Sequence, residues 1–325
     1  MRTLVIGGTG FLGVKVIRLL LERGEQVLCF DVATGSPRLA DVASGIRFLQ
    51  GNITAIEEII AAIRDHQVDR IIHLAYLKTA EAEVQLQKAM RLNVLGTTNV
   101  FEAARVTGVR RVAYVSSVGF YGLQSSFGER PVTEEDRGFP VTVYGYTKGL
   151  NDYLATRYAD LYGLEPVCLR LAFAFGHGRV GVGNAWPSTF ASNPAIGEPA
   201  SLPRNAQRKY CVIYVDDVAA ILCELALRER LDHRVYLSGG YTVSVAQLAA
   251  MVQEFIPDAR FTYDGKEGDH SYVYLLDSTR LCRELGVTLP PLKQRVLDHI
   301  NEARRCAGLP DLGGGKLGTP GLSGV

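Results

Sequence analysis

The chain has 325 residues, of which 47% are hydrophobic and 21% are charged, and this composition is typical of a globular protein rather than a disordered one. At roughly 150 residues per domain, the length predicts two domains or one large domain with an appendage. The 35 basic and 34 acidic side chains give a formal charge of +1. Such a balance gives no general electrostatic attraction to nucleic acid or to an anionic membrane.

Targeting and redox features predict a cytoplasmic protein. No apolar run approaches the roughly 18–20 residues of a membrane span, and the chain becomes glycine-rich at Gly7, too early for a secretory signal. The six cysteines are scattered, without a CxxC pair or a metal-ligand spacing, which is typical of reduced structural thiols. We therefore expect a small-molecule substrate as partner, and no nucleic acid, membrane or metal.

Short apolar strands alternate with helical segments through the first 170 residues. Strands are predicted near 4–6, 27–30, 46–49, 70–74, 112–115 and 166–169, and helices near 13–21, 55–66, 81–106 and 144–162. Strands that alternate with helices are joined by right-handed crossovers, so the pattern predicts a parallel sheet covered on both faces. The fold class is therefore α/β, with a doubly wound sheet.

The pattern changes after Arg170. Residues 173–210 are rich in small and turn-forming side chains and predict a long, loop-heavy excursion. Regular elements resume with strands near 212–215 and 235–237 and helices near 217–228, 244–256, 278–285 and 291–307. We expect a cofactor domain over 1–172 and a mainly substrate-binding α/β region over 173–310, with some segments returning to the first core. The glycine-rich tail, 311–325, is expected to be disordered.

A glycine motif lies where the first strand meets the first helix. Gly7, Gly10 and Gly13 have the spacing that lets a tight turn approach a pyrophosphate, while the helix N-terminus offers its N–H groups to the phosphates. Asp31 ends the next strand, 18 residues after Gly13, where a carboxylate binds ribose hydroxyls and repels a 2′-phosphate. The nearest downstream arginine is Arg38, so the motif favours NAD over NADP. The alternative is a turn-rich junction with Asp31 as a solvated strand end.

A second motif places Tyr144 and Lys148 four residues apart, on one face of a helix. Tyrosine is a poor base at neutral pH, but a neighbouring ammonium stabilises its phenolate, which can then take a hydroxyl proton. Upstream, an apolar strand ends in Ser116 and Ser117, and Ser117 is placed to hold the substrate oxygen. The alternative for this spacing is an exposed helix face.

Together these motifs resemble the extended short-chain dehydrogenase/reductase family, also called the NAD-dependent epimerase/dehydratase family, whose cofactor domain has the Rossmann fold. The similar stretches are residues 7–13, 72–75, 93–97, 116–122, 144–148 and 214–219, in the family's order and spacing. The resemblance covers most of residues 1–305. It implies NAD as cofactor and a homodimer formed by the helices over 81–106 and 144–162.

The resemblance also implies roles for individual residues. Tyr144 would be the catalytic acid/base, Lys148 would bind the nicotinamide ribose, Ser117 would orient the substrate, and Asn93 would support the proton relay or the cofactor. Asn52 stands where the family often has an aspartate that contacts adenine. The implied cofactor-binding residues are Gly7, Gly10, Phe11, Leu12, Gly13, Asp31, Asn52, Ile53, Leu74, Ala75, Tyr144 and Lys148.

Other residues have a structural interpretation that we favour or leave open. His73, at a strand end, is expected to pack rather than to catalyse. One of Asp216 and Asp217 is expected to cap a helix N-terminus or to contact substrate. Tyr121 and Tyr146 are expected in the pocket wall or the core.

The motifs differ from those of the family's dehydratases and nucleotide-sugar enzymes. Val118 and Gly119 stand where dehydratases have acidic residues, which argues against dehydration. Phe173 and His177 replace the asparagine and proline of a stretch that often contacts nucleotide sugars, and Tyr210-Cys211 replaces an arginine–aspartate pair. These changes remove phosphate or sugar contacts, although basic residues remain in the same region: Arg179, Arg204, Arg208 and Lys209.

We therefore predict an NAD-dependent dehydrogenase or reductase that acts on a secondary alcohol or ketone. Phe173, Phe175 and Trp186 suggest a partly apolar pocket, and a carboxylated or sugar-acid substrate fits if the arginines point inward. Two alternatives stay open. One is a nucleotide-sugar 4-epimerase that keeps its NAD, and the other is a non-catalytic NAD-sensing protein.

Overall fold

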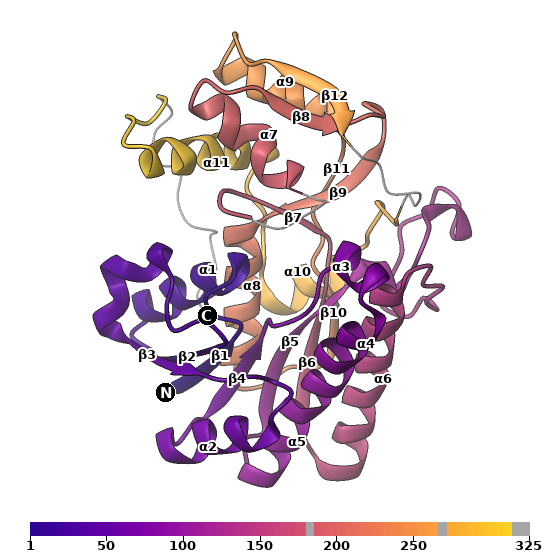
Figure 1. Ribbon diagram of the computed structural model, residues 1–325. Helices are drawn as coiled ribbons and strands as arrows, with labels where there is room; N and C mark the ends of the chain where they lie inside the picture. The colour runs from indigo at the N-terminus through magenta and orange to yellow at the C-terminus, as the bar shows by residue number, and fades with distance from the viewer. Residues whose placement is uncertain (180–184, 266–271, 314–325) are drawn as a thin grey trace. The chain divides into compact units, whose positions relative to one another are not determined.

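The computed structural model describes residues 1–179, 185–265 and 272–313 (Figure 1). The chain divides into two compact units. Unit 1 comprises residues 1–122, 134–171 and 218–238, and unit 2 comprises residues 123–133, 172–217 and 239–325. The expected disordered tail lies, from residue 314 on, outside the described residues. Within the described ranges, no helix combines the length and the apolar character that crossing a membrane requires.

Unit 1 is built on a seven-stranded parallel sheet with the order β10-β6-β5-β4-β1-β2-β3 (Figure 1). The strands are β1 (Arg2–Ile6), β2 (Gln26–Asp31), β3 (Ile46–Gln50), β4 (Arg70–His73), β5 (Arg111–Ser117), β6 (Glu165–Leu171) and β10 (Val235–Leu237). The strand order reverses between β1 and β4, and ligands of doubly wound sheets bind at such a reversal. The predicted α/β fold with a doubly wound, Rossmann-type sheet is confirmed.

Helices cover the sheet, and the central strands are almost fully buried, as their continuous apolar sequences require. The helical segments of unit 1 are α1 (Phe11–Glu22), the 3₁₀ segment η1 (Pro37–Gly45), α2 (Ile56–His66), α3 (Thr79–Val84), α4 (Leu86–Ala89), the π-helix η2 (Met90–Gly96), α5 (Thr97–Thr107), the 3₁₀ turn η3 (Val118–Phe120) and α6 (Val143–Tyr162). A core between β1, β2, β4 and β5 and the helices α2 and α5 includes Ile59, Ile63, Val100 and Phe101.

Unit 2 is smaller and mixed. Its elements are η4 (Gln124–Ser126), β7 (Phe173–Phe175), α7 (Trp186–Ala195), β8 (Ala200–Pro203), β9 (Lys209–Tyr214), β11 (Tyr241–Ser244), α9 (Val245–Phe255), β12 (Phe261–Gly265), α10 (Thr279–Leu285) and α11 (Leu292–Cys306). The helix α8 (Val215–Leu227) begins in unit 2 and continues into unit 1. One sheet has the order β11-β9-β7, and a second pairs β12 with β8.

Two predictions about secondary structure were wrong. Residues 173–210 are not mainly loop, because β7, α7 and β8 lie within the described part of this stretch. The single helix expected over 81–106 is divided into α3, α4, η2 and α5. The second prediction failed because the apolar periodicity continues through residues 81–106, whereas the π-helix within this stretch has i→i+5 instead of i→i+4 hydrogen bonds, which periodicity does not reveal.

Candidate active site

The glycine-rich loop between β1 and α1 has the backbone that a phosphate cradle needs. Gly7 has φ +83°, and a Cβ atom there would lie 2.8 Å from the Ala75 backbone nitrogen. A Cβ atom at Gly13 would lie 2.4 Å from the Gly7 carbonyl oxygen, so α1 approaches β1 closely only because residue 13 is glycine. Gly10 is the N-cap of α1 and gives the helix no side-chain cap, which leaves the first-turn N–H groups for an anion.

Asp31 is held by this loop. Its Oδ2 atom accepts hydrogen bonds from the Thr9 backbone N–H (3.1 Å) and from the Thr9 hydroxyl (2.7 Å). The half-buried carboxylate therefore lies beside the glycine-rich turn rather than in open solvent. A negative charge in this place suits ribose hydroxyls and opposes a 2′-phosphate, so the loop and Asp31 together fit NAD.

The other predicted cofactor residues lie at the carboxyl ends of neighbouring strands. The Leu74 N–H donates to the Ile6 carbonyl, and Ala75 lies against Gly7, so the segment after β4 borders the glycine-rich loop. Asn52 is exposed, and its side-chain oxygen accepts from the Thr54 backbone and hydroxyl, both at 3.0 Å. Ile53 is buried. Contacts of Asn52 and Ile53 with an adenine stay a prediction. The same holds for cofactor contacts of Phe11 and Leu12, which are half-buried at the start of α1.

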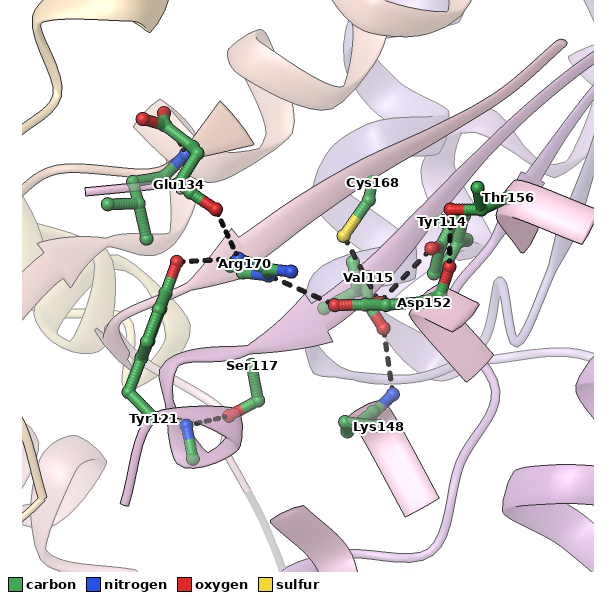
Figure 2. Close-up of polar contacts among 12 residues, drawn as sticks. Tyr114, Val115, Ser117, Tyr121, Glu134, Lys148, Asp152, Thr156, Cys168 and Arg170 are labelled. Atoms are coloured by element: carbon green, nitrogen blue, oxygen red, sulfur yellow. Dashed lines mark hydrogen bonds and ion pairs between the residues drawn. The ribbon is translucent and has the colours of Figure 1, made fainter. Parts of the chain in front are cut away.

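Ser117 and Tyr144 flank the same glycine. Ser117 ends β5, and its Oγ atom accepts from the Gly119 N–H at 3.0 Å (Figure 2). A Cβ atom at Gly119 would lie 3.2 Å from Ser117 Oγ and 3.8 Å from Tyr144 Cδ1. Tyr144 is 8% exposed, in the first turn of α6, whose N-cap Thr142 accepts from the Gly145 N–H. The strand end and the helix start thus bring the serine hydroxyl and the tyrosine ring together.

Lys148 lies one helical turn after Tyr144 and is buried. Its Nζ atom donates to the Val115 carbonyl at 2.7 Å and lies 5.5 Å from the centre of the Tyr144 ring (Figure 2). Burial lowers the pKa of the Lys148 ammonium to about 8, and the negative charge of Asp152 opposes this decrease. The lysine therefore carries its charge at neutral pH and loses it as the pH rises through about 8.

His73 has the packing role that we favoured from the sequence. It is 4% exposed at the end of β4, and its Nε2 atom lies 3.0 Å from the Thr97 hydroxyl oxygen. Burial, with the nearby Lys148 charge as a smaller cause, lowers the pKa of His73 to about 3. The ring is therefore neutral at physiological pH, and a proton-transfer role would need a very acidic medium.

Asn93 joins the segment after β4 to α6. It is fully buried in the π-helix η2, where its side chain accepts from the Leu77 N–H (2.6 Å) and donates to the Leu77 carbonyl (3.1 Å) and the Thr147 hydroxyl (3.3 Å). Its own carbonyl accepts from the Asn151 amide at 2.7 Å. Asn93 thus fixes the helix that carries Tyr144 and Lys148 against the loop that borders the glycine motif.

Sequence analysis did not identify two parts of this site. The Tyr76 ring lies 4.2 Å from Lys148 Nζ and 5.7 Å from the Tyr144 ring, so the ammonium faces two aromatic rings. A buried ion pair joins Asp152 on α6 to Arg170 on β6, with the Asp152 Oδ2 and Arg170 Nε atoms 3.0 Å apart. Two signals were available from the sequence: Tyr76 directly follows Leu74 and Ala75, and Asp152 lies four residues after Lys148.

Some of the remaining predicted residues lie where the sequence led us to expect them, and others do not. Asp217 forms a buried ion pair with Arg295 of α11 in unit 2, and burial raises the pKa of its carboxyl. Asp216 and Asp217 both lie in the first turn of α8 rather than before it. Tyr121 is buried as expected, but Tyr146 is 64% exposed, so its assignment to the core or a pocket wall was wrong because it faces outward on α6.

The aromatic residues singled out in the second half of the chain pack together in unit 2. Phe173 is stacked on Trp186, with ring centres 5.3 Å apart, and lies 5.2 Å from the Tyr210 ring. The Arg179 guanidinium lies 5.1 Å from the centre of the Phe173 ring. Phe175 is buried against Tyr214, and His177 Nδ1 lies 2.9 Å from the Ser192 hydroxyl oxygen.

Comparisons with known proteins show the family and the fold of the chain. The model of the NAD dependent epimerase/dehydratase family matches residues 3–237. D-erythronate dehydrogenase from Cupriavidus necator is 31% identical over 62% of this chain and 63% of its own length. UDP-glucose 4-epimerase from Halalkalibacterium halodurans is 30% identical over 56% of this chain, and the match spans 54% of that enzyme. An L-threonine dehydrogenase structure from Cupriavidus necator has a TM-score of 0.82 at 22% identity and covers 93% of this chain and 99% of that one, which shows a shared fold.

Proposed function

The chain belongs to the NAD dependent epimerase/dehydratase family, a family of NAD-dependent enzymes, and we propose that this member is a dehydrogenase or reductase of a secondary alcohol or ketone. The observation that carries the proposal is the grouping of Ser117 and Tyr144 around Gly119, with Lys148 beside the Tyr144 ring, at the same edge of the sheet as the glycine-rich loop. Unit 1 alone supplies all of these residues.

The proposed reaction assigns one task to each residue. Gly7, Gly10, Gly13 and Asp31 would hold the cofactor, and NAD, when bound, supplies the nicotinamide that accepts or returns a hydride. Since the Gly119 N–H already occupies one lone pair of the Ser117 oxygen, the serine hydroxyl can donate its hydrogen to a substrate oxygen. Tyr144 takes the substrate's hydroxyl proton in oxidation and returns it in reduction, and the Lys148 charge stabilises the phenolate between these steps.

The substrate that we favour is a small hydroxy acid or a similar secondary alcohol rather than a nucleotide sugar. Phe173 is engaged in ring stacking at the position where nucleotide-sugar enzymes of the family often have an amide. His177, in place of a proline, contacts Ser192. The names of two similar proteins, D-erythronate dehydrogenase and L-threonine dehydrogenase, each denote oxidation of a small hydroxylated acid.

A 4-epimerase is the second candidate, because a UDP-glucose 4-epimerase is 30% identical over more than half of this chain. It would use the same serine, tyrosine and lysine. The two candidates differ in cofactor handling, since a dehydrogenase must release NADH after each oxidation, whereas an epimerase regenerates NAD in place. Release of the cofactor is therefore the test of the proposal. A non-catalytic NAD sensor has no use for the complete Ser117, Tyr144 and Lys148 set.

We also propose that the protein is a cytoplasmic homodimer. All six cysteines are free thiols, which supports a reducing compartment. Large apolar side chains are exposed on the neighbouring helices α3–α6 of unit 1 (Figure 1): Val84, Leu86, Met90, Leu95, Val106, Tyr146, Leu150, Tyr153, Leu161 and Tyr162. Exposed apolar side chains on neighbouring helices support an interface, and a second copy would cover the same helices on each subunit.

A charge placed in this helix face is expected to separate the dimer. Tyr153 is 63% exposed in the middle of α6, so Tyr153→Glu would put a carboxylate into each half of a symmetric contact. Light scattering after gel filtration should give twice the 35.5 kDa chain mass for the native protein and one chain mass for the variant. Ile196→Glu, at another exposed apolar position, should remain dimeric. A monomeric native protein at micromolar concentration would show that the dimer proposal is wrong.

A further inference from the structure

A buried carboxylate lies directly behind the proposed catalytic pair. Tyr144, Lys148 and Asp152 follow one another at four-residue intervals on α6, so they share one face of the helix. Lys148 is 3% exposed and Asp152 is 8% exposed. An acid and a base so placed, and both removed from water, interact far more strongly than a surface pair.

Three donors fix the Asp152 carboxylate (Figure 2). Its Oδ2 atom accepts from Arg170 Nε at 3.0 Å, and its Oδ1 atom accepts from the Tyr114 hydroxyl at 3.1 Å and the Cys168 thiol at 3.4 Å. These donors come from β5 and β6, the two strands beneath α6. The carboxylate is therefore held in one orientation by the sheet.

Arg170 extends this network to the loop that follows Ser117. Its Nη1 atom donates to the Tyr121 hydroxyl at 2.6 Å and to the Glu134 carbonyl at 3.1 Å, and its guanidinium lies 4.3 Å from the centre of the Phe120 ring. Arg170 therefore faces Asp152 on one side and the 118–121 turn on the other (Figure 2). The Arg170 guanidinium is thus held in place by contacts on both sides.

Three buried titratable groups near Lys148 and Asp152 are neutral at physiological pH: His73, Tyr114 and Cys168. Burial lowers the pKa of His73 to about 3 and raises the pKa values of the Tyr114 hydroxyl and the Cys168 thiol well above their usual range. Asp152 is the larger of the two groups that raise the pKa of Lys148 against the effect of its burial, and Cys168 is the smaller. The groups that face Lys148 are His73 on β4, Tyr76 after β4, Cys168 on β6, and Tyr144 and Asp152 on α6. Tyr114 on β5 and Arg170 on β6 contact the Asp152 carboxylate.

We propose that Asp152 is a positioning residue for the reaction: its buried carboxylate, oriented by Arg170 and Tyr114, keeps the Lys148 ammonium charged beside Tyr144. This inference rests on the proposed function, because hydride transfer with Tyr144 as acid/base needs that charge. A purely structural ion pair would hold α6 on the sheet but would not control the protonation of Lys148.

Lysine-selective ¹³Cε NMR tests the inference without substrate or cofactor. The chain has eight lysines, and Lys148→Arg identifies the Lys148 signal. In Asp152→Asn, which keeps the shape of the side chain, that signal should titrate roughly one to two units below its native position near pH 8. In Tyr114→Phe, which removes a hydrogen bond but no charge, it should stay within a few tenths of a unit. An unshifted Lys148 titration in Asp152→Asn would overturn the inference.

A double variant and a kinetic pH profile complete the test. If Asp152→Asn does not fold with Arg170 left unpaired, Asp152→Asn with Arg170→Gln removes the same carboxylate and leaves two amides, and the same downward shift is expected. With D-erythronate or L-threonine and NAD, the pH at which kcat/KM of Asp152→Asn falls on the alkaline side should decrease together with the NMR titration of Lys148. A purely structural role would lower the maximum kcat/KM but leave that pH unchanged. If the native protein reduces no NAD with either probe, the proposed function fails. The NMR titration still decides whether the Asp152 carboxylate controls the protonation of Lys148.

Discussion

Replacing Tyr144 with phenylalanine is expected to lower turnover by about 100-fold or more while NAD affinity stays within a few-fold. The change removes one oxygen atom from a side chain that is 8% exposed and leaves the ring that packs against Tyr76. Without the hydroxyl, no group in this position can take the substrate proton. The measurement is kcat for NAD reduction with the probe that the native protein oxidises, with NAD binding followed by calorimetry.

Tyr146→Phe is the matched control for this variant. Tyr146 lies two residues further along the same helix but is 64% exposed, so loss of its hydroxyl should leave kcat unchanged. If Tyr144→Phe kept substantial activity, the acid/base assignment would be wrong and another proton acceptor would be required. If the protein were an NAD sensor without catalysis, both variants would keep its full function.

Replacing Gly13 with alanine is expected to weaken NAD binding by about tenfold or more and to destabilise the fold by about 1–3 kcal/mol. The added Cβ atom would lie 2.4 Å from the Gly7 carbonyl oxygen and 2.6 Å from Gly8 Cα. Both atoms belong to the backbone, so the glycine-rich loop must move away from α1 to make room. Calorimetric titration with NAD and thermal unfolding without it measure the two effects separately.

Gly35→Ala provides the comparison, because a Cβ atom at Gly35 meets nothing within 4 Å and the residue lies in the next loop of the same sheet edge. That variant should bind NAD and unfold like the native protein. Equal NAD affinity in Gly13→Ala and the native protein would show that the close approach of loop and helix does not form the phosphate cradle.

The parallel sheet and the proximity of Tyr144 and Lys148 were predictable because their signals are local. Each buried strand is a short apolar run, and the glycine spacing and the four-residue interval from Tyr144 to Lys148 depend only on nearby positions. These local patterns also carried the family resemblance, and the family model confirms it over residues 3–237. The roles of the individual site residues stay predictions until variants test them.

The parts that the sequence did not predict depend on partners distant in the chain. The π-helix at Asn93 is associated with side-chain bonds to Leu77 and Thr147, which helical periodicity cannot reveal. The Asp152–Arg170 pair spans a helix and a strand. The short strand β8 pairs with β12, about 60 residues later, and the prolines of α7 hide its helical pattern: Pro187 at its start and Pro194 within it.

The most direct test of the proposed function is the nucleotide content of the purified protein, because it needs no knowledge of the substrate. The protein is purified without added nucleotide and denatured, and the released NAD and NADP are quantified by mass spectrometry. A dehydrogenase that exchanges its cofactor in every cycle should contain little nucleotide and should bind added NAD reversibly, in preference to NADP. Near-stoichiometric NAD retained through purification would contradict this account and favour an epimerase, and bound NADP would contradict the role of Asp31.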